Sequence, residues 1–178
     1  MSHDDDLKPV YAGQHLSMVV RDDWEFVVRN TGRPAVGIVA ITNAGHVVLA
    51  EQYRPPVGRR VVELPAGLTG DIAGEEHEAF LEAARRELLE ETGYIAERWT
   101  ELGSGYSSAG LTDESIVLFL AESLTKQGPG GGDDSEDITV HEVPRESIVG
   151  WLNERNMPVD LKLLAALYAA EHELITRA

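Results

Sequence analysis

Three glutamates at helical spacing, Glu87, Glu90 and Glu91, are the residues of this sequence best suited to do chemistry. Residues three and four apart lie on one face of an α-helix, so these carboxylates would be close enough to repel one another. Hard divalent ions such as Mg²⁺ prefer oxygen ligands and are commonly held by carboxylates together with substrate phosphates. The spacing therefore predicts a metal site, although a bare pair of glutamates is more often a solvated helix face.

The composition limits what else the protein can do. The 178 residues include 15 Lys and Arg against 31 Asp and Glu, a net charge of −16. This charge disfavours nucleic acid and an anionic membrane as partners, because both are bound by clustered basic residues. There are no cysteines, which excludes disulfides, thiolate-bound metals and thiol nucleophiles. The acidic N-terminus lacks the layout of a secretory signal, so we expect a cytoplasmic protein.

Several common functional motifs are absent or incomplete. Neither a G-x-x-x-x-G-K-[ST] loop nor a G-x-G-x-x-G segment occurs, which removes the two usual nucleotide fingerprints. Residues 133–144 resemble the start of a calcium loop, but Ile138 and Pro144 occupy positions that require Gly and Glu. Residues 106–110 are one residue short of a serine-hydrolase elbow. The glutamate helix thus remains the strongest functional signal.

The hydrophobic patterning predicts one α/β domain over residues 1–178. A helix is expected over 75–92, because its apolar positions have helical spacing and Gly93 follows as a C-terminal cap. Asn43 and Gly45 predict a hairpin turn. The glycine-rich, acidic segment 128–137 is expected to be a flexible loop. Further strands are expected over 10–20, 24–29, 36–42, 47–51, 60–64, 97–103, 115–122 and 138–143, and further helices over 145–153 and 158–177, the latter with Leu161, Leu164, Ala165 and Tyr168 on one face.

The segment from Glu78 to Tyr94 resembles the signature of the Nudix hydrolases, G-x5-E-x7-R-E-U-x-E-E-x-G-U, where U is a bulky apolar residue. It matches every fixed position, including R-E-L-L-E-E-T-G-Y at 86–94. Upstream the match fails, because ten residues separate Gly67 from Glu78 where five are usual. We therefore expect an insertion within 71–77, where Glu75 is a competing candidate for the first glutamate.

Other segments are similar to the ADP-ribose pyrophosphatase branch of this family. They are W-E-F-V at 24–27, Q-Y-R at 52–54, E-L-P-A-G at 63–67 and E-D-I-T-V at 136–140. The resemblance implies a Nudix fold with a mixed β-sheet between helices, preceded by antiparallel N-terminal strands. Members of this branch hydrolyse nucleoside diphosphate sugars with Mg²⁺. They are generally homodimers, and the N-terminal strands, about 10–30 here, help to build the partner's site beside a catalytic core at 31–178.

The resemblance also implies roles for the metal-site residues. Glu87 and Glu91 would bind Mg²⁺, or Mn²⁺ as a substitute, together with the Ala66 carbonyl. Glu90 would ligate or support the metal, and Arg86 would orient the carboxylates by charge-assisted hydrogen bonds. In the loop before the last strand, Glu136 would complete the metal site or act as the base, and Asp134 is its nearby rival.

The substrate-binding residues implied by the resemblance lie elsewhere in the chain. Trp24 would stack on the nucleobase, in its own subunit or across the dimer, and Glu25 would lie beside it. Arg54 would contact the diphosphate, and Glu63 would contact the base or ribose. Ala109 stands where ADP-ribose enzymes of this family usually have a proline in a Ser-Pro-Gly loop. That departure keeps other nucleoside diphosphate sugars open as substrates.

The sequence thus predicts a Mg²⁺-dependent pyrophosphohydrolase that cleaves ADP-ribose or a related nucleotide sugar to a nucleoside monophosphate and a sugar phosphate. Two alternatives remain. One is a Nudix enzyme acting on a dinucleotide polyphosphate or a nucleoside triphosphate, and the other is a non-catalytic, nucleotide-binding regulatory domain. The intact carboxylates Glu87, Glu90 and Glu91 count against the second alternative, because a domain without catalysis has no reason to keep them.

Overall fold

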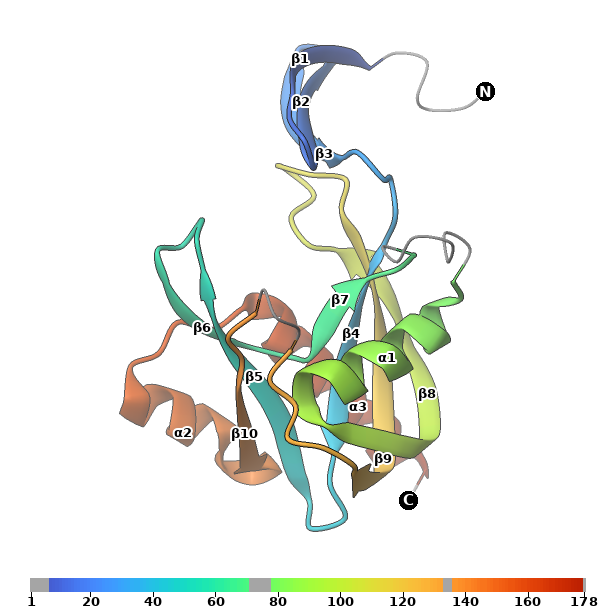
Figure 1. The fold of residues 1–178 in the computed structure, drawn as a ribbon, viewed down its shortest axis with the longest axis vertical. Helices are drawn as coiled ribbons and strands as arrows, with labels where there is room; N and C mark the ends of the chain where they lie inside the picture. The colour runs from blue at the N-terminus through green and yellow to red at the C-terminus, as the bar shows by residue number, and fades with distance from the viewer. Residues whose placement is uncertain (1–6, 71–77, 133–135, 178) are drawn as a thin grey trace.

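The computed structural model describes residues 7–70, 78–132 and 136–177, and it contains two β-sheets and three α-helices in this part of the chain. A small sheet lies at one end of the molecule (top of Figure 1) and a larger, mixed sheet forms the body. The expected α/β architecture with antiparallel N-terminal strands is therefore confirmed.

The larger sheet has seven strands in the order β10-β5-β4-β9-β8, with β6 paired to β5 and β7 paired to β4. Strand β4 runs parallel to β9, and the other neighbours are antiparallel, so the sheet is mixed. The strands are β4 (Ala35–Ile41), β5 (His46–Arg54), β6 (Arg59–Glu63), β7 (Ala66–Leu68), β8 (Tyr94–Tyr106), β9 (Ser115–Lys126) and β10 (Thr139–Pro144).

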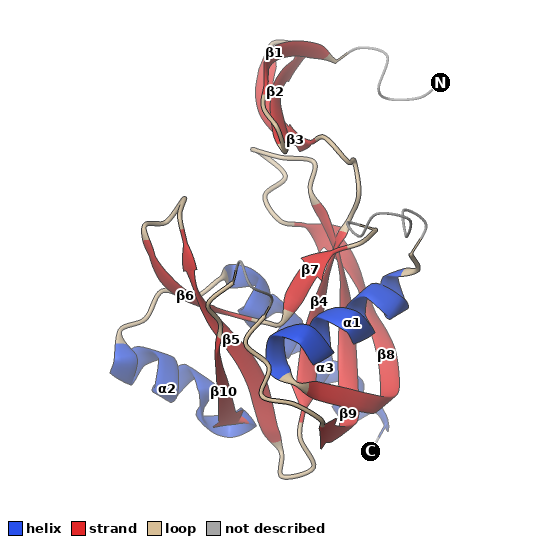
Figure 2. Cartoon of the chain, in the orientation of Figure 1, coloured by secondary structure: helices blue, strands red, loops and turns tan. Residues whose placement is uncertain are grey.

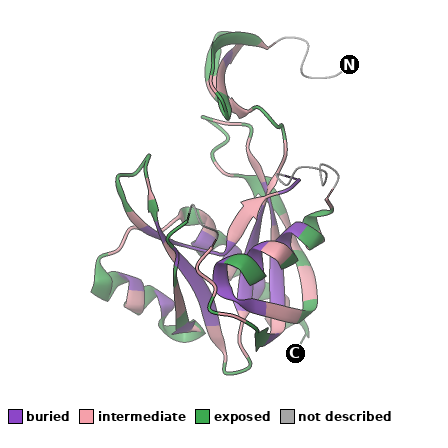
Figure 3. Cartoon of the chain, viewed as in Figure 1, coloured by how far each residue is buried: buried purple, intermediate pink, exposed green. Residues whose placement is uncertain are grey.

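Helices cover both faces of this sheet, as Figure 2 shows for α1 (Phe80–Thr92) in front and α3 (Leu161–Arg177) behind. Alternate residues of β4 point to opposite faces, as expected for a strand. Val36 and Ile38 pack with α1 residues such as Leu88, whereas Val39 packs with Leu163 of α3 and with α2 (Ile148–Arg155). The sheet therefore lies between two hydrophobic cores, and its central strands are the most buried part of the chain (Figure 3).

Helix α1 ends where the sequence predicts. Gly93 adopts a left-handed conformation with φ of 72°, and its N–H donates to the Leu89 carbonyl at 2.8 Å. The helix begins at Phe80, after Ala79, which is later than predicted. The expected insertion within 71–77 lies outside the described residues. The predicted hairpin between β4 and β5 is confirmed, with Gly45 at φ of 80°.

The face of α3 that the sequence pattern singles out, with Leu161 and Tyr168, is the outer face of the helix. The buried residues of this helix are Leu163, Ala166 and Ala170, whereas Leu161 and Tyr168 are each 76% exposed. Apolar residues line two sides of this helix, so their period alone does not say which side packs against the sheet. The strands that α3 covers determine which side is buried, because Leu163 belongs to the same hydrophobic cluster as Val39 of β4.

The small sheet consists of β1 (Lys8–Ala12), β2 (Leu16–Arg21) and β3 (Trp24–Arg29), all antiparallel. The single extended segment predicted over 10–20 is divided, because Gly13 donates to the Leu16 carbonyl at 2.9 Å in a turn between β1 and β2. The sheet meets the body where the Val27 N–H donates to the Leu111 carbonyl at 2.9 Å. It exposes several large apolar side chains, namely Val10, Tyr11, Leu16, Trp24 and Val27.

None of the described helices is long and apolar enough to cross a membrane.

Candidate active site

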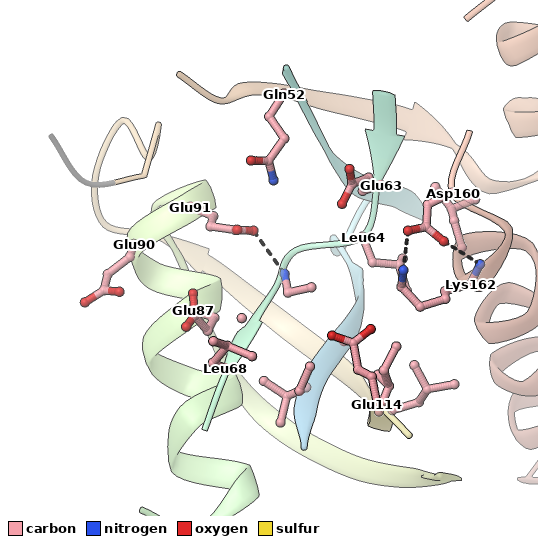
Figure 4. A pocket seen from close by; sticks show the side chains of 18 of the residues that line it. Gln52, Glu63, Leu64, Leu68, Glu87, Glu90, Glu91, Glu114, Asp160 and Lys162 are labelled. Atoms are coloured by element: carbon pink, nitrogen blue, oxygen red, sulfur yellow. Dashed lines mark hydrogen bonds and ion pairs between the residues drawn. The ribbon is translucent and has the colours of Figure 1, made fainter. Parts of the chain in front are cut away.

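A cleft of about 600 Å³ opens between α1, β7 and the ends of β4, β6 and β9. It gathers residues from segments far apart in the sequence, and Figure 4 shows their side chains converging from α1 on one side and from the start of α3 on the other. Eight residues predicted from the sequence line this cleft: Ala66, Arg86, Glu87, Glu90, Glu91, Glu136, Arg54 and Glu63.

Glu91 is the most buried carboxylate of the cleft, with 1% of its surface exposed. Its Oε2 accepts a hydrogen bond from the Ala66 N–H at 3.1 Å (Figure 4). Burial raises the pKa of Glu91 to about 9, and the negative charges of Glu87 and Glu136 add to the effect against the opposing Ala66 hydrogen bond. The charged form of Glu91 is therefore disfavoured in this cleft unless a cation lies beside it.

Arg86 connects the carboxylates of α1. Its Nη1 donates to Glu87 Oε1 at 2.7 Å and reaches Glu90 Oε2 at 3.4 Å. Its Nη2 donates to the Leu68 carbonyl of β7 at 3.1 Å. The guanidinium is only 16% exposed, so these charge-assisted bonds form largely away from water. The geometry matches the orienting role expected for Arg86.

Glu78 is the second partner of Arg86. Its two carboxylate oxygens accept from Arg86 Nε and Nη2, each at 3.2 Å, and its Oε2 also accepts from the Gly70 N–H at 3.1 Å. The Arg86 hydrogen bonds hold the pKa of Glu78 below its usual value. This contact favours Glu78 as the first glutamate of the signature. Its rival, Glu75, lies outside the described residues.

Gly67 allows β7 to lie directly against α1. A Cβ atom at this position would be 1.9 Å from Glu87 Oε1, so a side chain cannot be accommodated without moving the carboxylate. The flanking residue Ala66 is fixed by its pairing with Gly37 of β4. The glycine of the expected motif is thus explained by close approach of the backbone to Glu87.

The chemistry of these residues fits a divalent cation. Glu87, Glu91 and Glu136 leave excess negative charge around a buried point, and oxygen donors of this kind suit Mg²⁺. In the described ranges, no three acidic or histidine side chains already converge in a coordinating arrangement. Glu87 is turned to Arg86 and Glu91 to the Ala66 amide, so coordination would require these side chains to adjust.

Arg54 and Glu63 form the part of the cleft between β5 and β6. Arg54 Nε and Nη2 donate to the two Glu63 oxygens, each at 2.6 Å. Glu63 is buried, whereas the side chain of Arg54 is 42% exposed. Hydrogen bonding to Glu63 raises the pKa of Arg54, so the guanidinium stays charged beside the cleft. A fixed cation here suits the diphosphate contact expected for Arg54.

The far wall of the cleft was not predicted from the sequence. Arg29 Nη2 pairs with Glu114 Oε1 at 2.7 Å, and Lys162 pairs with Asp160 at the start of α3. Burial raises the pKa of Glu114, but the hydrogen bonds from Arg29 and Ser107 and the positive charges of Arg29 and Lys162 together outweigh burial, so the pKa is lowered. Gln52 lies above Glu91 in Figure 4 and also lines the cleft. The residues of the far wall come from segments without a local motif, so no sequence signal marks them. Gln52, in contrast, belongs to the Q-Y-R segment at 52–54, which carries part of the family resemblance.

Trp24 and Ala109 lie together, but in a second pocket of about 480 Å³ that they share with Arg21, Phe26 and Tyr106. Trp24 Nε1 donates to the Gly110 carbonyl at 3.3 Å. Neither residue is among the lining residues of the carboxylate cleft, and Glu25 lines neither of the two pockets. The structure therefore separates the predicted base-stacking residue from the predicted metal site of the same chain.

The mixed sheet between helices and the carboxylate cleft beside α1 are the features expected of a Nudix hydrolase. The model of the NUDIX domain family matches residues 31–167, and the chain belongs to this family. It is 34% identical over 150 residues to the methanol dehydrogenase activator of Bacillus methanolicus, covering 84% of this chain and 77% of the relative. It is 36% identical over 132 residues to the ADP-ribose pyrophosphatase of Bacillus subtilis (strain 168), covering 74% and 68%.

A solved structure confirms the fold independently. The crystal structure of an ADP compounds hydrolase superposes with a TM-score of 0.76 at 23% sequence identity, covering 97% of this chain and 93% of that one. The predicted Nudix fold and the assignment to the Nudix hydrolases are thus confirmed.

Proposed function

We propose that this protein is a metal-dependent pyrophosphohydrolase that cleaves ADP-ribose or a closely related nucleoside diphosphate sugar. The observation that carries the proposal is the buried Glu91 carboxylate, placed with Glu87 and Glu136 in a cleft whose other wall offers Arg54 and Lys162. A diphosphate carries negative charge, which a divalent ion held by the carboxylates and the basic side chains of the other wall would neutralise together. The similarity to an ADP-ribose pyrophosphatase supports the choice of substrate.

The reaction adds water to one phosphorus and breaks the bridging P–O bond, giving a nucleoside monophosphate and a sugar phosphate. When bound, a divalent ion supplies charge neutralisation and activates water for this attack. Glu87, Glu91 and Glu136 would hold this ion, while Arg86 would keep Glu87 and Glu90 in place through its hydrogen bonds. Glu136 would either complete the metal site or accept the proton of the attacking water.

The proposal includes three features taken from the sequence. Mg²⁺ is the natural ion, with Mn²⁺ as a substitute. The enzyme is cytoplasmic. It is a homodimer in which the small sheet of β1–β3 contacts the partner, and the exposed apolar side chains on this sheet, such as Tyr11 and Val10, support such a contact.

A panel of nucleotide sugars tests the proposed reaction. We expect hydrolysis of ADP-ribose that depends on Mg²⁺, and slower hydrolysis of ADP-glucose, UDP-glucose and GDP-mannose, with products resolved by chromatography. Preference for one of the other three would keep the reaction class and change the sugar or base. Hydrolysis of none of the four would contradict the proposal and would favour a regulatory role, for which the similarity to an activator protein is the supporting observation.

We further propose that Trp24 serves the cleft of the partner subunit, because it lies outside the cleft of its own chain. Trp24→Ala should raise KM with little change in kcat, since stacking on the base contributes binding that is uniform along the reaction. Because this variant leaves the proposed metal ligand Glu91 in place, kcat should be retained.

Mixing two inactive or impaired homodimers tests this arrangement. Subunits with Trp24→Ala and subunits with Glu91→Gln, exchanged at low substrate, should form mixed dimers with one complete site and regain activity. Mixed dimers that show only the average activity of the two parents would mean that Trp24 does not serve the partner's cleft.

A further inference from the structure

The loop that carries Glu136 is held at its end by Arg60, a residue of β6. Arg60 Nη1 donates to Asp137 Oδ2 at 2.9 Å, and Nη2 donates to the Asp137 carbonyl at 3.2 Å and to Thr139 Oγ1 at 3.0 Å. These bonds reach the residue directly after Glu136 and the first residue of β10. Arg60 therefore ties the end of the loop to the neighbouring strands of the sheet.

Arg60 is itself fixed by a second set of contacts. Its Nε donates to Glu51 Oε1 at 2.6 Å and its Nη2 to the Glu51 carbonyl at 2.9 Å. The other Glu51 oxygen lies 2.8 Å from His141 Nε2. Glu51 belongs to β5, which pairs with both β6 and β10. The guanidinium is thus held in one orientation, as a positioning group requires.

The start of the same loop is held by α1. The N–H groups of Gly131 and Gly132 donate to the Glu91 and Glu90 carbonyls at 2.8 and 3.1 Å. Gly130 has φ of 70°, and a Cβ there would be 2.4 Å from the Thr92 carbonyl carbon. Backbone hydrogen bonds therefore attach Gly131 and Gly132 to the last turn of the helix.

Glu136 lies between these two attachments. A Cβ on Gly132 would be 2.4 Å from Glu136 Oε2, so the carboxylate lies directly against that glycine. It also lines the carboxylate cleft together with Glu91. We propose that Arg60 is a positioning residue that keeps Glu136 beside Glu91 and thereby sets the affinity of the metal site. This inference rests on the proposed function, because it assigns Glu136 to that site.

A purely structural role for Arg60 predicts that its loss affects the stability of the fold and not the affinity for Mg²⁺. Asp137 is 89% exposed and Arg60 is 32% exposed, so their ion pair should add little to stability. If Arg60 were only a structural contact, its loss would lower stability through the bonds to Glu51 and Thr139 but would leave the Mg²⁺ affinity unchanged. If it positions Glu136, its loss should weaken metal binding while the fold is retained.

Titration calorimetry with Mg²⁺ on the full chain tests the inference without any substrate. We expect Arg60→Met to weaken Mg²⁺ binding about tenfold, the usual effect of removing a group that orients a metal ligand. Arg60→Lys should behave similarly, because an ammonium keeps the charge but cannot reach Glu51, Asp137 and Thr139 together. Arg59→Met is the matched control, since it removes the same charge from an exposed neighbour, and it should leave binding unchanged.

A double-variant cycle shows whether Arg60 acts through Glu136. In a Glu136→Gln background, Arg60→Met should cause no further loss of Mg²⁺ affinity. An equal loss in both backgrounds, or a loss shared with Arg59→Met, would overturn the inference. If the wild type binds Mg²⁺ with this dependence on Arg60 but hydrolyses no nucleotide sugar, the proposed function fails and the positioning role stands.

Discussion

Glu91→Gln is expected to lower the Mg²⁺-dependent hydrolysis rate by on the order of a thousandfold, about 4 kcal/mol of transition-state stabilisation. The amide has nearly the shape of the carboxylate and can still accept the Ala66 hydrogen bond, but it is a poor ligand for a hard cation. Steady-state kinetics with ADP-ribose at saturating Mg²⁺ measure the effect.

The same variant should keep or increase thermal stability in the absence of metal. The pKa of Glu91 is raised to about 9, so between its ordinary value and pH 9 the folded state binds more protons than the unfolded state. Stability of the metal-free wild type should therefore fall as the pH rises through this range, and Gln cannot contribute such a loss. Mg²⁺ should raise the melting temperature of the wild type but not of the variant.

Glu97→Gln is the control for this prediction, because it removes the same charge from an exposed position on β8. It should leave the rate and the Mg²⁺ response unchanged. A Glu91→Gln enzyme with a rate within tenfold of the wild type would show that Glu91 is not a metal ligand.

Arg86→Met is expected to damage both stability and activity. It removes the Arg86 ion pairs of Glu78 and Glu87, whose side chains are only 6% and 10% exposed. Breaking such a buried pair costs about 3 kcal/mol, which corresponds to roughly 6–12 °C in melting temperature for a chain of this length. The rate should fall about 10–100-fold, because Glu87 and Glu90 lose the group that orients them.

Two further variants make this result interpretable. Arg85→Met removes a charge from the adjacent residue, which is 51% exposed and pairs only with Glu82 of its own helix in the described structure, and should change the melting temperature very little. If Arg86→Met does not fold, Arg86→Lys keeps the charge without the planar geometry and should fold with a reduced rate. Full activity in Arg86→Lys would contradict the orienting role.

The predictable part of the site is the part encoded locally. Glu87, Glu90 and Glu91 are placed by the period of one helix, and Gly93 ends that helix where its left-handed conformation is needed. Gly67 is explained by the close approach of its backbone to Glu87. The motif implies a glycine here, but the spacing of the residues does not reveal this contact. These residues carry signals that depend on neighbours in sequence, and the structure confirms the helix and its end at Gly93.

The far wall of the cleft depends on tertiary structure. Arg29, Glu114 and Lys162 meet because β3, the segment before β9 and α3 converge at one end of the sheet, and no local pattern predicts that meeting. The same reason explains the outward face chosen for α3. The hydrogen bond from the Gly131 N–H to the Glu91 carbonyl is a further example, because it joins the loop to α1 and no local pattern predicts it.

The most direct test of the central claim is to quantify both products of ADP-ribose hydrolysis by the purified wild type, with Mg²⁺ and with the metal removed by chelation. The carboxylate cleft predicts equal amounts of AMP and ribose 5-phosphate, formed only when Mg²⁺ is present and nearly abolished by Glu91→Gln. Binding of ADP-ribose without turnover, or turnover that persists without metal and in Glu91→Gln, would contradict it.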